Sequence, residues 1–129
     1  MLSVKPSVAT WMPKLFAQNE RVAYIGKWKN DWFFSFIAVG ATNVGSITVD
    51  KDPKLYTNCY GNLPNKCLKK DMQSLQTGKG DKFGKFNLGS TVVLIFEESA
   101  HFQFDVKPGQ TIRMGMKLWN KEWKYGKDV

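Results

Sequence analysis

The feature that most constrains the fold is the grouping of apolar residues along the chain. They come in short runs rich in Val, Ile, Phe, Tyr and Trp, and they do not recur at helical spacing for more than a turn or two. Such runs are typical of β-strands, because branched and aromatic side chains pack well on a pleated surface. A chain of 129 residues has the length of one ordinary domain. The sequence therefore predicts a single, mainly β domain spanning residues 1–129.

The strand candidates lie on both sides of a polar stretch, residues 50–80. Residues 21–28 and 32–41 flank a short polar turn at 29–31, so we expect them to pair as a hairpin. Residues 32–41 are apolar on both faces, so we expect this strand near the centre of the domain. The polar stretch contains Pro, Gly and Asn and is expected to form a long surface loop, with one helical turn at 69–75. The whole pattern predicts a compact, barrel-sandwich-like antiparallel β domain with a long polar surface loop. Its seven or so expected strands are residues 21–28, 32–41, 43–49, 85–88, 91–97, 101–106 and 111–118.

Charge and hydropathy exclude several classes of protein. The hydrophobic content of 43% is too high for a disordered chain. The longest near-apolar stretch, residues 32–41, is shorter than the roughly 20 residues of a membrane-spanning helix, and we expect no such helix. The net charge is +8, but the lysines are scattered and the aromatic residues lie mostly in apolar runs. We therefore expect no nucleic-acid partner, and an anionic membrane surface is at least as good a partner for these lysines.

Few residues suggest metal binding or acid–base catalysis. His101 is the only histidine, and the alternation around it predicts an exposed strand residue. With Cys59 and Cys67 it provides too few ligands for a zinc site, and we expect the two cysteines to be free thiols. Glu97 and Glu98 are adjacent, so in a strand they point to opposite faces. The sequence predicts no metal site.

One peptide bond offers a different chemistry. Gly89 precedes Ser90 at the start of a very apolar run. Because glycine has no side chain, its carbonyl is open to attack by the serine hydroxyl, which converts the amide into an ester. β-Elimination then cleaves the chain and leaves dehydroalanine, which hydrolyses to a pyruvoyl group able to withdraw electrons from a bound amine. Taken by themselves, these residues indicate an ordinary loop that leads into a strand, and the tripeptide alone does not predict this chemistry.

Longer blocks around this bond resemble one enzyme family. Over about residues 7–118 the sequence is similar to the phosphatidylserine decarboxylases, pyruvoyl-dependent enzymes of phospholipid biosynthesis, and most of all to their mitochondrial type. The 84–97 block contains the Leu-Gly-Ser-Thr processing motif. The blocks are residues 19–22 (NERV), 39–47 (VGATNVGSI), 84–97 (GKFNLGSTVVLIFE) and 106–115 (VKPGQTIRMG).

The resemblance implies a self-processing zymogen and a lyase. Gly89 provides the carbonyl at which the chain is cleaved, and Ser90 is the nucleophile that becomes the pyruvoyl cofactor. Residues 1–89 then belong to the larger chain and residues 90–129 form the small chain. The pyruvoyl forms a Schiff base with phosphatidylserine, CO2 leaves, and phosphatidylethanolamine is released. The implied location is the mitochondrial inner membrane, bound peripherally, with phosphatidylserine, an anionic membrane surface and the other processed chain as partners.

The sequence also departs from the family pattern. In the family, self-cleavage uses an Asp and a His upstream of the NERV block, and the 18 residues before Asn19 contain neither. We therefore expect this chain to correspond to the C-terminal part of the enzyme, and by itself neither to cleave efficiently nor to decarboxylate. The alternative is a truncated, non-catalytic remnant that binds anionic lipid surfaces. The state of the Gly89–Ser90 bond distinguishes the two.

Overall fold

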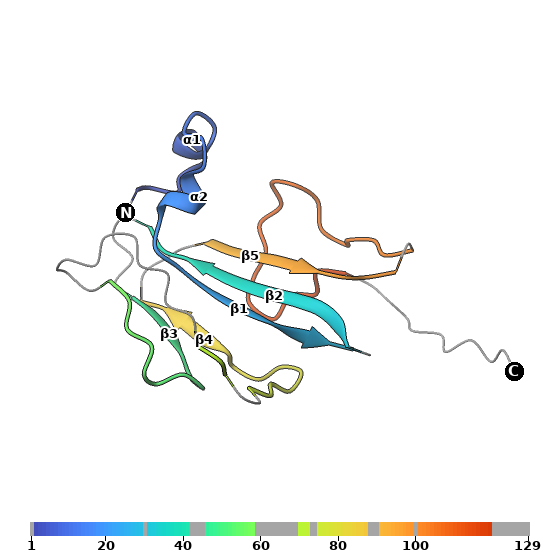
Figure 1. Cartoon of the computed structure of the whole chain (residues 1–129). Coiled ribbons are helices and arrows are strands. Elements are labelled where there is room, and N and C mark those ends of the chain that lie inside the picture. Colours follow the sequence, from blue (N-terminus) through green and yellow to red (C-terminus); the bar gives the residue numbers. More distant parts are fainter. Residues whose placement is uncertain are drawn as a thin grey trace, which may run out of the picture. The chain divides into compact units, whose positions relative to one another are not determined.

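The computed structural model shows short antiparallel strands preceded by two single-turn helices (Figure 1). It describes residues 2–29, 31–41, 46–58, 70–72, 75–87, 91–99 and 101–119. The chain divides into two compact units, Met1–Phe96 and Glu97–Val129, and all the helices and strands of the described residues lie in the first. The predicted mainly β, antiparallel class is confirmed, while the single domain stays a prediction.

The first unit begins with α1 (Pro6–Ala9) and α2 (Leu15–Gln18). Pro6 occupies the first position of α1, where its missing N–H breaks no helical hydrogen bond. Lys14 has a φ of 57°, in the left-handed region, and turns the chain directly before α2. Single turns of this length leave no helical period in a sequence, so the apolar pattern did not reveal them.

A three-stranded antiparallel sheet forms the centre of the first unit. Its order is β1 (Arg21–Trp28), β2 (Trp32–Val39) and β5 (Thr91–Phe96), with β2 in the middle. The predicted hairpin and the central place of the 32–41 strand are therefore confirmed. Lys29 and Asp31 both have positive φ values, 35° and 65°, which is the backbone twist that a tight hairpin turn requires.

The two ends of this sheet are packed differently. At the hairpin end, the Trp28 ring lies 5.6 Å from that of Phe34 and 5.2 Å from that of Phe96. At the other end the central strand finishes with small residues, and Ala38 and Val39 are almost fully buried. Aromatic packing therefore stabilises the hairpin, while the opposite end of the central strand is buried.

A second sheet pairs β3 (Ile47–Val49) with β4 (Gly84–Phe86). β3 is the described part of the strand predicted at residues 43–49, of which 43–45 lie outside the described residues. Just before β4, the Phe83 ring lies 4.8 Å from that of Phe36 and 5.3 Å from that of Tyr24. Phe83 thus packs the segment that leads into β4 against the three-stranded sheet.

The β3–β4 pair needs a glycine at Gly84. A Cβ built at this position would lie 2.3 Å from the carbonyl oxygen of Thr48 and 3.1 Å from the Cα of Val49. These are backbone atoms of β3, so the two strands approach too closely for any side chain here.

The polar stretch after β3 is irregular wherever the structure describes it, as predicted. The helical turn expected at 69–75 is absent from residues 70–72 and 75, and the rest of that turn lies outside the described residues. Asp52 is only 7% exposed. It accepts a hydrogen bond from the Tyr24 hydroxyl at 3.3 Å and forms an ion pair with Lys70 at 3.0 Å. This buried carboxylate fastens the polar stretch to β1.

The strands predicted at residues 101–106 and 111–118 are wrong. The second unit contains a single bridge between Phe104 and Trp119 within its described residues. Phe104 is 58% exposed, so the alternating pattern does not bury it. A period of two forms a strand only where another strand pairs with it, and Gly115, with a φ of 80°, turns the chain within the second candidate.

Candidate functional site

The two predicted catalytic residues, Gly89 and Ser90, lie outside the described residues. The structure does describe their neighbours on both sides, Asn87 and Thr91. The candidate site is therefore built from these neighbours and from the elements that hold them.

Thr91, directly after Ser90, begins β5 at the buried end of the three-stranded sheet, opposite the hairpin turn. It pairs with Val39 of β2, and Val39 pairs in turn with Arg21 of β1. Val39 is 1% exposed, so this pairing is buried. The downstream side of Ser90 is thus attached to the central sheet.

Asn87, upstream of the predicted cleavage point, is attached to the second sheet instead. Its backbone N–H donates to the carbonyl oxygen of Ser46 at 3.1 Å. Its side-chain amide also donates to the hydroxyl oxygen of Ser46. This pair of hydrogen bonds, which we call the Asn87–Ser46 clamp, holds the end of β4 against the start of β3.

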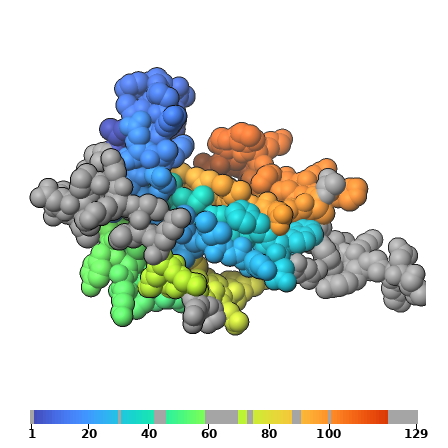
Figure 2. Space-filling view, in the orientation of Figure 1, coloured from blue at the N-terminus to red at the C-terminus, as the bar shows by residue number. Residues whose placement is uncertain are grey.

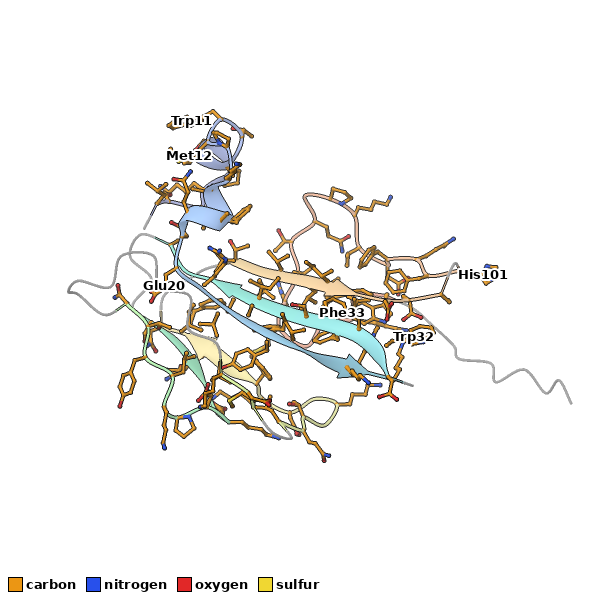
Figure 3. All side chains as sticks on the ribbon, in the orientation of Figure 1. Trp11, Met12, Glu20, Trp32, Phe33 and His101 are labelled. Atoms are coloured by element: carbon orange, nitrogen blue, oxygen red, sulfur yellow. The ribbon has the colours of Figure 1, made fainter. Side chains whose placement is uncertain are left out.

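Three blocks that are far apart in the sequence therefore meet at one end of the first unit. Besides the clamp and the Val39–Thr91 pair, the Gly40 N–H donates to the carbonyl oxygen of Glu20 at 2.8 Å. The Glu20 carboxylate accepts a hydrogen bond from the Asn58 N–H at 2.8 Å, and Figure 3 shows Glu20 at the start of β1. The blocks joined here are residues 19–22, 39–47 and 84–97.

A cavity of about 230 Å³ lies between the two sheets, beside this end. Val92, two residues after Ser90, contributes to its wall, and most of the other side chains that line it are apolar. Such a wall can hold hydrocarbon and has little affinity for water. It is formed by Phe36, Ala38, Ile47, Thr48, Val49, Phe83, Gly84, Lys85, Phe86 and Val92. A larger hollow, about 670 Å³, is bounded only by residues 9–17 and lies on the helical segment.

The titratable cluster in the middle of β1 has a structural role. Burial, the negative charge of Asp52 and the hydrogen bond to Asp52 together raise the pKa of Tyr24 to about 12. Tyr24 is therefore protonated at neutral pH, and its hydroxyl donates a hydrogen bond to the Asp52 carboxylate. Tyr24 pairs with Phe36, well inside the sheet rather than at the Thr91 end, so we assign it to packing.

None of the remaining sequence candidates that the structure describes lies in the first unit. His101 is exposed, as predicted, but in an irregular segment of the second unit instead of a strand. Glu97 and Glu98 follow β5 rather than lying in it. Cys59 and Cys67 lie outside the described residues. Among the described residues, no three His, Cys, Asp or Glu side chains lie close enough together to hold a metal ion.

Sequence reasoning missed the residues that support the site. Asn87 and Ser46 both lie inside the blocks that carry the family resemblance, which is the one signal that pointed to them. Thr57, whose hydroxyl accepts from the Ile47 N–H at 2.8 Å, lies in the polar stretch and had no such signal. Within the described part of the chain, none of the helices has the length and apolar character of a membrane span.

Comparison with known proteins connects this geometry to a family. The family model described as phosphatidylserine decarboxylase matches residues 1–120. The mitochondrial phosphatidylserine decarboxylase proenzyme of Cricetulus griseus is 45% identical over 125 residues, covering 92% of this chain and 30% of that protein. The mitochondrial proenzyme 1 of Saccharomyces cerevisiae is 42% identical over 128 residues, covering 92% and 25%. That of Caenorhabditis elegans is 40% identical over 119 residues, covering 92% and 31%.

This chain thus spans less than a third of the length of these relatives. No solved structure matches it. The family match covers nearly the whole chain and includes the three blocks that meet at the Thr91 end of the sheet. The chain therefore belongs to the phosphatidylserine decarboxylase family.

Proposed function

We propose that this chain forms the pyruvoyl-bearing part of a phosphatidylserine decarboxylase, with Ser90 as the precursor of the pyruvoyl group. The observation that carries the proposal is the convergence of the three family blocks around the Leu-Gly-Ser-Thr motif. The Asn87–Ser46 clamp and the Val39–Thr91 pair attach the two sides of the Gly89–Ser90 bond to two different sheets. Attachment on both sides favours the positioning that an intramolecular attack requires.

Self-processing would convert the Gly89–Ser90 amide into a carboxylate on one chain and a pyruvoyl group on the other. The Ser90 hydroxyl attacks the Gly89 carbonyl, the C–N bond breaks, and an ester replaces the amide. Removal of the α-proton of residue 90 expels the Gly89 carboxylate and leaves dehydroalanine. Water then adds to the imine tautomer and ammonia leaves. In total one water is consumed and one ammonia released, giving chains 1–89 and 90–129.

When present, the pyruvoyl group provides a carbonyl that condenses with the substrate amine and accepts the electrons released as CO2 departs. The residues around it contribute position and environment. Val92, two residues after Ser90 in the sequence, and the cavity beside it offer an apolar wall, which suits a substrate that carries hydrocarbon chains. We assign phosphatidylserine as the substrate and phosphatidylethanolamine as the product.

The names of the relatives support this enzyme over a non-catalytic, lipid-binding remnant, since each is a decarboxylase proenzyme. They also support a mitochondrial location, and we propose peripheral attachment to the inner membrane. The second processed chain remains a proposed partner.

The bond between Gly89 and Ser90 provides the direct test. We expect the 129-residue polypeptide by itself to give one species of 14.7 kDa by intact mass under denaturing conditions. The reason is that residues 1–18 contain neither the Asp nor the His that the family uses. Cleavage would give species of about 10 and about 4.6 kDa, in proportion to 89 and 40 of the 129 residues, the smaller one blocked to Edman degradation by its pyruvoyl group.

A chimera tests the chemistry with an upstream segment present. In it, this chain replaces the matching 125-residue region of the Cricetulus griseus proenzyme. We expect cleavage at Gly89–Ser90 and formation of phosphatidylethanolamine from phosphatidylserine. Ser90→Ala is expected to abolish both, and Ser99→Ala, a serine beyond β5, is the matched control. A folded chimera that makes phosphatidylethanolamine equally well with Ser90→Ala would contradict the proposal.

A further inference from the structure

The segment before β1 is a loop whose two ends are joined by hydrogen bonds. The Leu2 N–H donates to the Asn19 side-chain oxygen at 2.6 Å, and the Asn19 side-chain amide donates to the Leu2 carbonyl at 2.9 Å. Asn19 is 1% exposed. One buried amide therefore links the first described residue to Asn19, two positions before β1. We call residues 2–19, which include α1 and α2, the helical loop.

Other hydrogen bonds stabilise the helical loop without burying its apolar tip. The Arg21 guanidinium donates to the carbonyl oxygens of Ala17 at 2.8 Å and Asn19 at 3.2 Å, at the end of α2. The Gln18 side-chain amide donates to the Pro13 carbonyl at 3.1 Å. Leu15 is the one hydrophobic residue of this segment that is fully buried. The conformation of the loop thus depends on these polar contacts and on the burial of Leu15.

The tip of the loop exposes large apolar side chains. Trp11 is 68% exposed and Phe16 is 40% exposed. Figure 3 shows Trp11 and Met12 at the end of the loop farthest from the strands of this unit, and Figure 2 shows the loop standing out from those strands. The only charged side chains in residues 2–19 are those of Lys5 and Lys14, both exposed. Aromatic residues beside lysines, with no acidic residue, suit the boundary between anionic headgroups and acyl chains.

The helical loop lies at the same end of the sheet as the processing motif. Only Glu20 separates it from Arg21, the first residue of β1. Arg21 pairs with Val39, and Val39 pairs with Thr91, the residue after Ser90. Figure 1 shows α2 leading into β1 beside the end of β2 and the start of β5.

We propose that the helical loop is a docking element for an anionic phospholipid bilayer, into which Trp11 and Phe16 insert while Lys5 and Lys14 contact the headgroups. The inference rests on the proposed function, because it gives the Ser90 end of the sheet access to a substrate that resides in a bilayer. Charge complementarity selects the occupant: a cationic loop with an apolar tip matches an anionic bilayer.

Vesicle flotation with the full 129-residue chain tests the docking. The vesicles contain phosphatidylcholine alone, phosphatidylcholine with phosphatidylserine, or phosphatidylcholine with phosphatidylglycerol. We expect binding to both anionic mixtures, weaker binding to phosphatidylcholine, and a steep loss of binding with salt. The double variant Trp11→Ala/Phe16→Ala should lower the partition coefficient at least about tenfold. Tyr56→Ala, which removes an 81% exposed aromatic side chain elsewhere in the unit, should leave it within about twofold.

Charge variants test the second half of the proposal. Lys5→Gln and Lys14→Gln should each weaken binding to anionic vesicles by about fivefold at low salt. The matched control is Lys27→Gln, which removes an exposed lysine near the hairpin end of β1. Circular dichroism of every variant checks that the fold is retained. Quenching of tryptophan fluorescence by brominated lipid should fall in Trp11→Phe if Trp11 enters the bilayer.

Three results would overturn the docking proposal. The first is unchanged vesicle binding by the folded Trp11→Ala/Phe16→Ala variant. The second is a change in sedimentation with no change in vesicle affinity, which would make the tip a contact between copies of the chain. The third is equal losses for Lys5→Gln and Lys27→Gln, which would indicate a diffuse charge effect.

The two proposals can fail separately, because flotation needs no catalysis. If the chimera cleaves normally but the loop variants of the 129-residue chain still bind vesicles normally, only the docking proposal is contradicted. If the loop variants lose vesicle binding but the chimera does not decarboxylate phosphatidylserine, only the proposed function is contradicted.

Discussion

Replacing Gly84 with alanine tests the close approach of β3 and β4. The new Cβ would meet the Thr48 carbonyl oxygen at 2.3 Å and the Val49 Cα at 3.1 Å. Because both atoms belong to the backbone of the paired strand, no side-chain rotation relieves the overlap and the strand itself must move. Overpacking that shifts backbone costs about 1–3 kcal/mol. We expect Gly84→Ala to lower the free energy of unfolding by an amount in the upper part of that range.

Gly26→Ala is the matched control, since it adds the same methyl group to β1 where no atom lies within 4 Å. There the alanine restricts the unfolded chain, and we expect a change of no more than about 1 kcal/mol, in the stabilising direction. The assay is urea unfolding followed by circular dichroism. With a slope of about 1–3 kcal/mol per molar urea, the midpoint of Gly84→Ala should lie about 1 M or more below that of Gly26→Ala. Equal midpoints would refute the argument that this glycine is required by backbone contact.

Three further predictions concern groups placed by the fold. Folding raises the pKa of Tyr24 to about 12, so the stability that its protonated hydroxyl contributes should be complete below about pH 10 and be lost as the pH rises toward 12. Tyr24→Phe should flatten this part of a plot of unfolding free energy against pH. An unchanged plot would contradict the hydrogen bond from Tyr24 to Asp52 as the cause. Asp52→Ala should cost about 1–3 kcal/mol in urea unfolding because it leaves the half-buried Tyr24 hydroxyl without its acceptor, whereas Lys70→Met should cost less than about 1 kcal/mol because Lys70 is 56% exposed; equal losses would show that the ion pair dominates. Asn87→Ala breaks the side-chain half of the clamp on Ser46 and should slow cleavage of the chimera about tenfold with little change in its melting temperature; a normal rate would show that the clamp does not position the bond.

The accuracy of the sequence interpretation differs between the two units. In the first unit the hairpin was predicted, with the bounds of β1 and with a second strand two residues longer than β2, because Arg21–Trp28 and Trp32–Val39 follow one another across a short polar turn. In the second unit an equally clear alternation at residues 101–106 produced only one bridge. Alternation describes a strand that has a partner, and the pattern of one segment does not say where its partner lies.

The candidate site shows the same division. Gly89 and Ser90 were identified from their chemistry and from the blocks around them. The Asn87–Ser46 clamp was not, because a hydrogen bond between residues so far apart in sequence depends on how two sheets pack. The helical loop was missed as well, since its fastening depends on one buried asparagine rather than on a repeating pattern.

The sequence by itself determined the local properties of this protein: which runs are apolar enough to form strands, where the chain turns, and which peptide bond carries a serine able to attack its own backbone. These follow from side-chain shape and hydrophobicity over a few residues. Tertiary structure decided which runs found partners, and it brought Val39, Thr91 and Arg21 together at one end of a sheet. Pairing between distant segments is stabilised only when the whole sheet closes, so no single stretch of sequence reveals it.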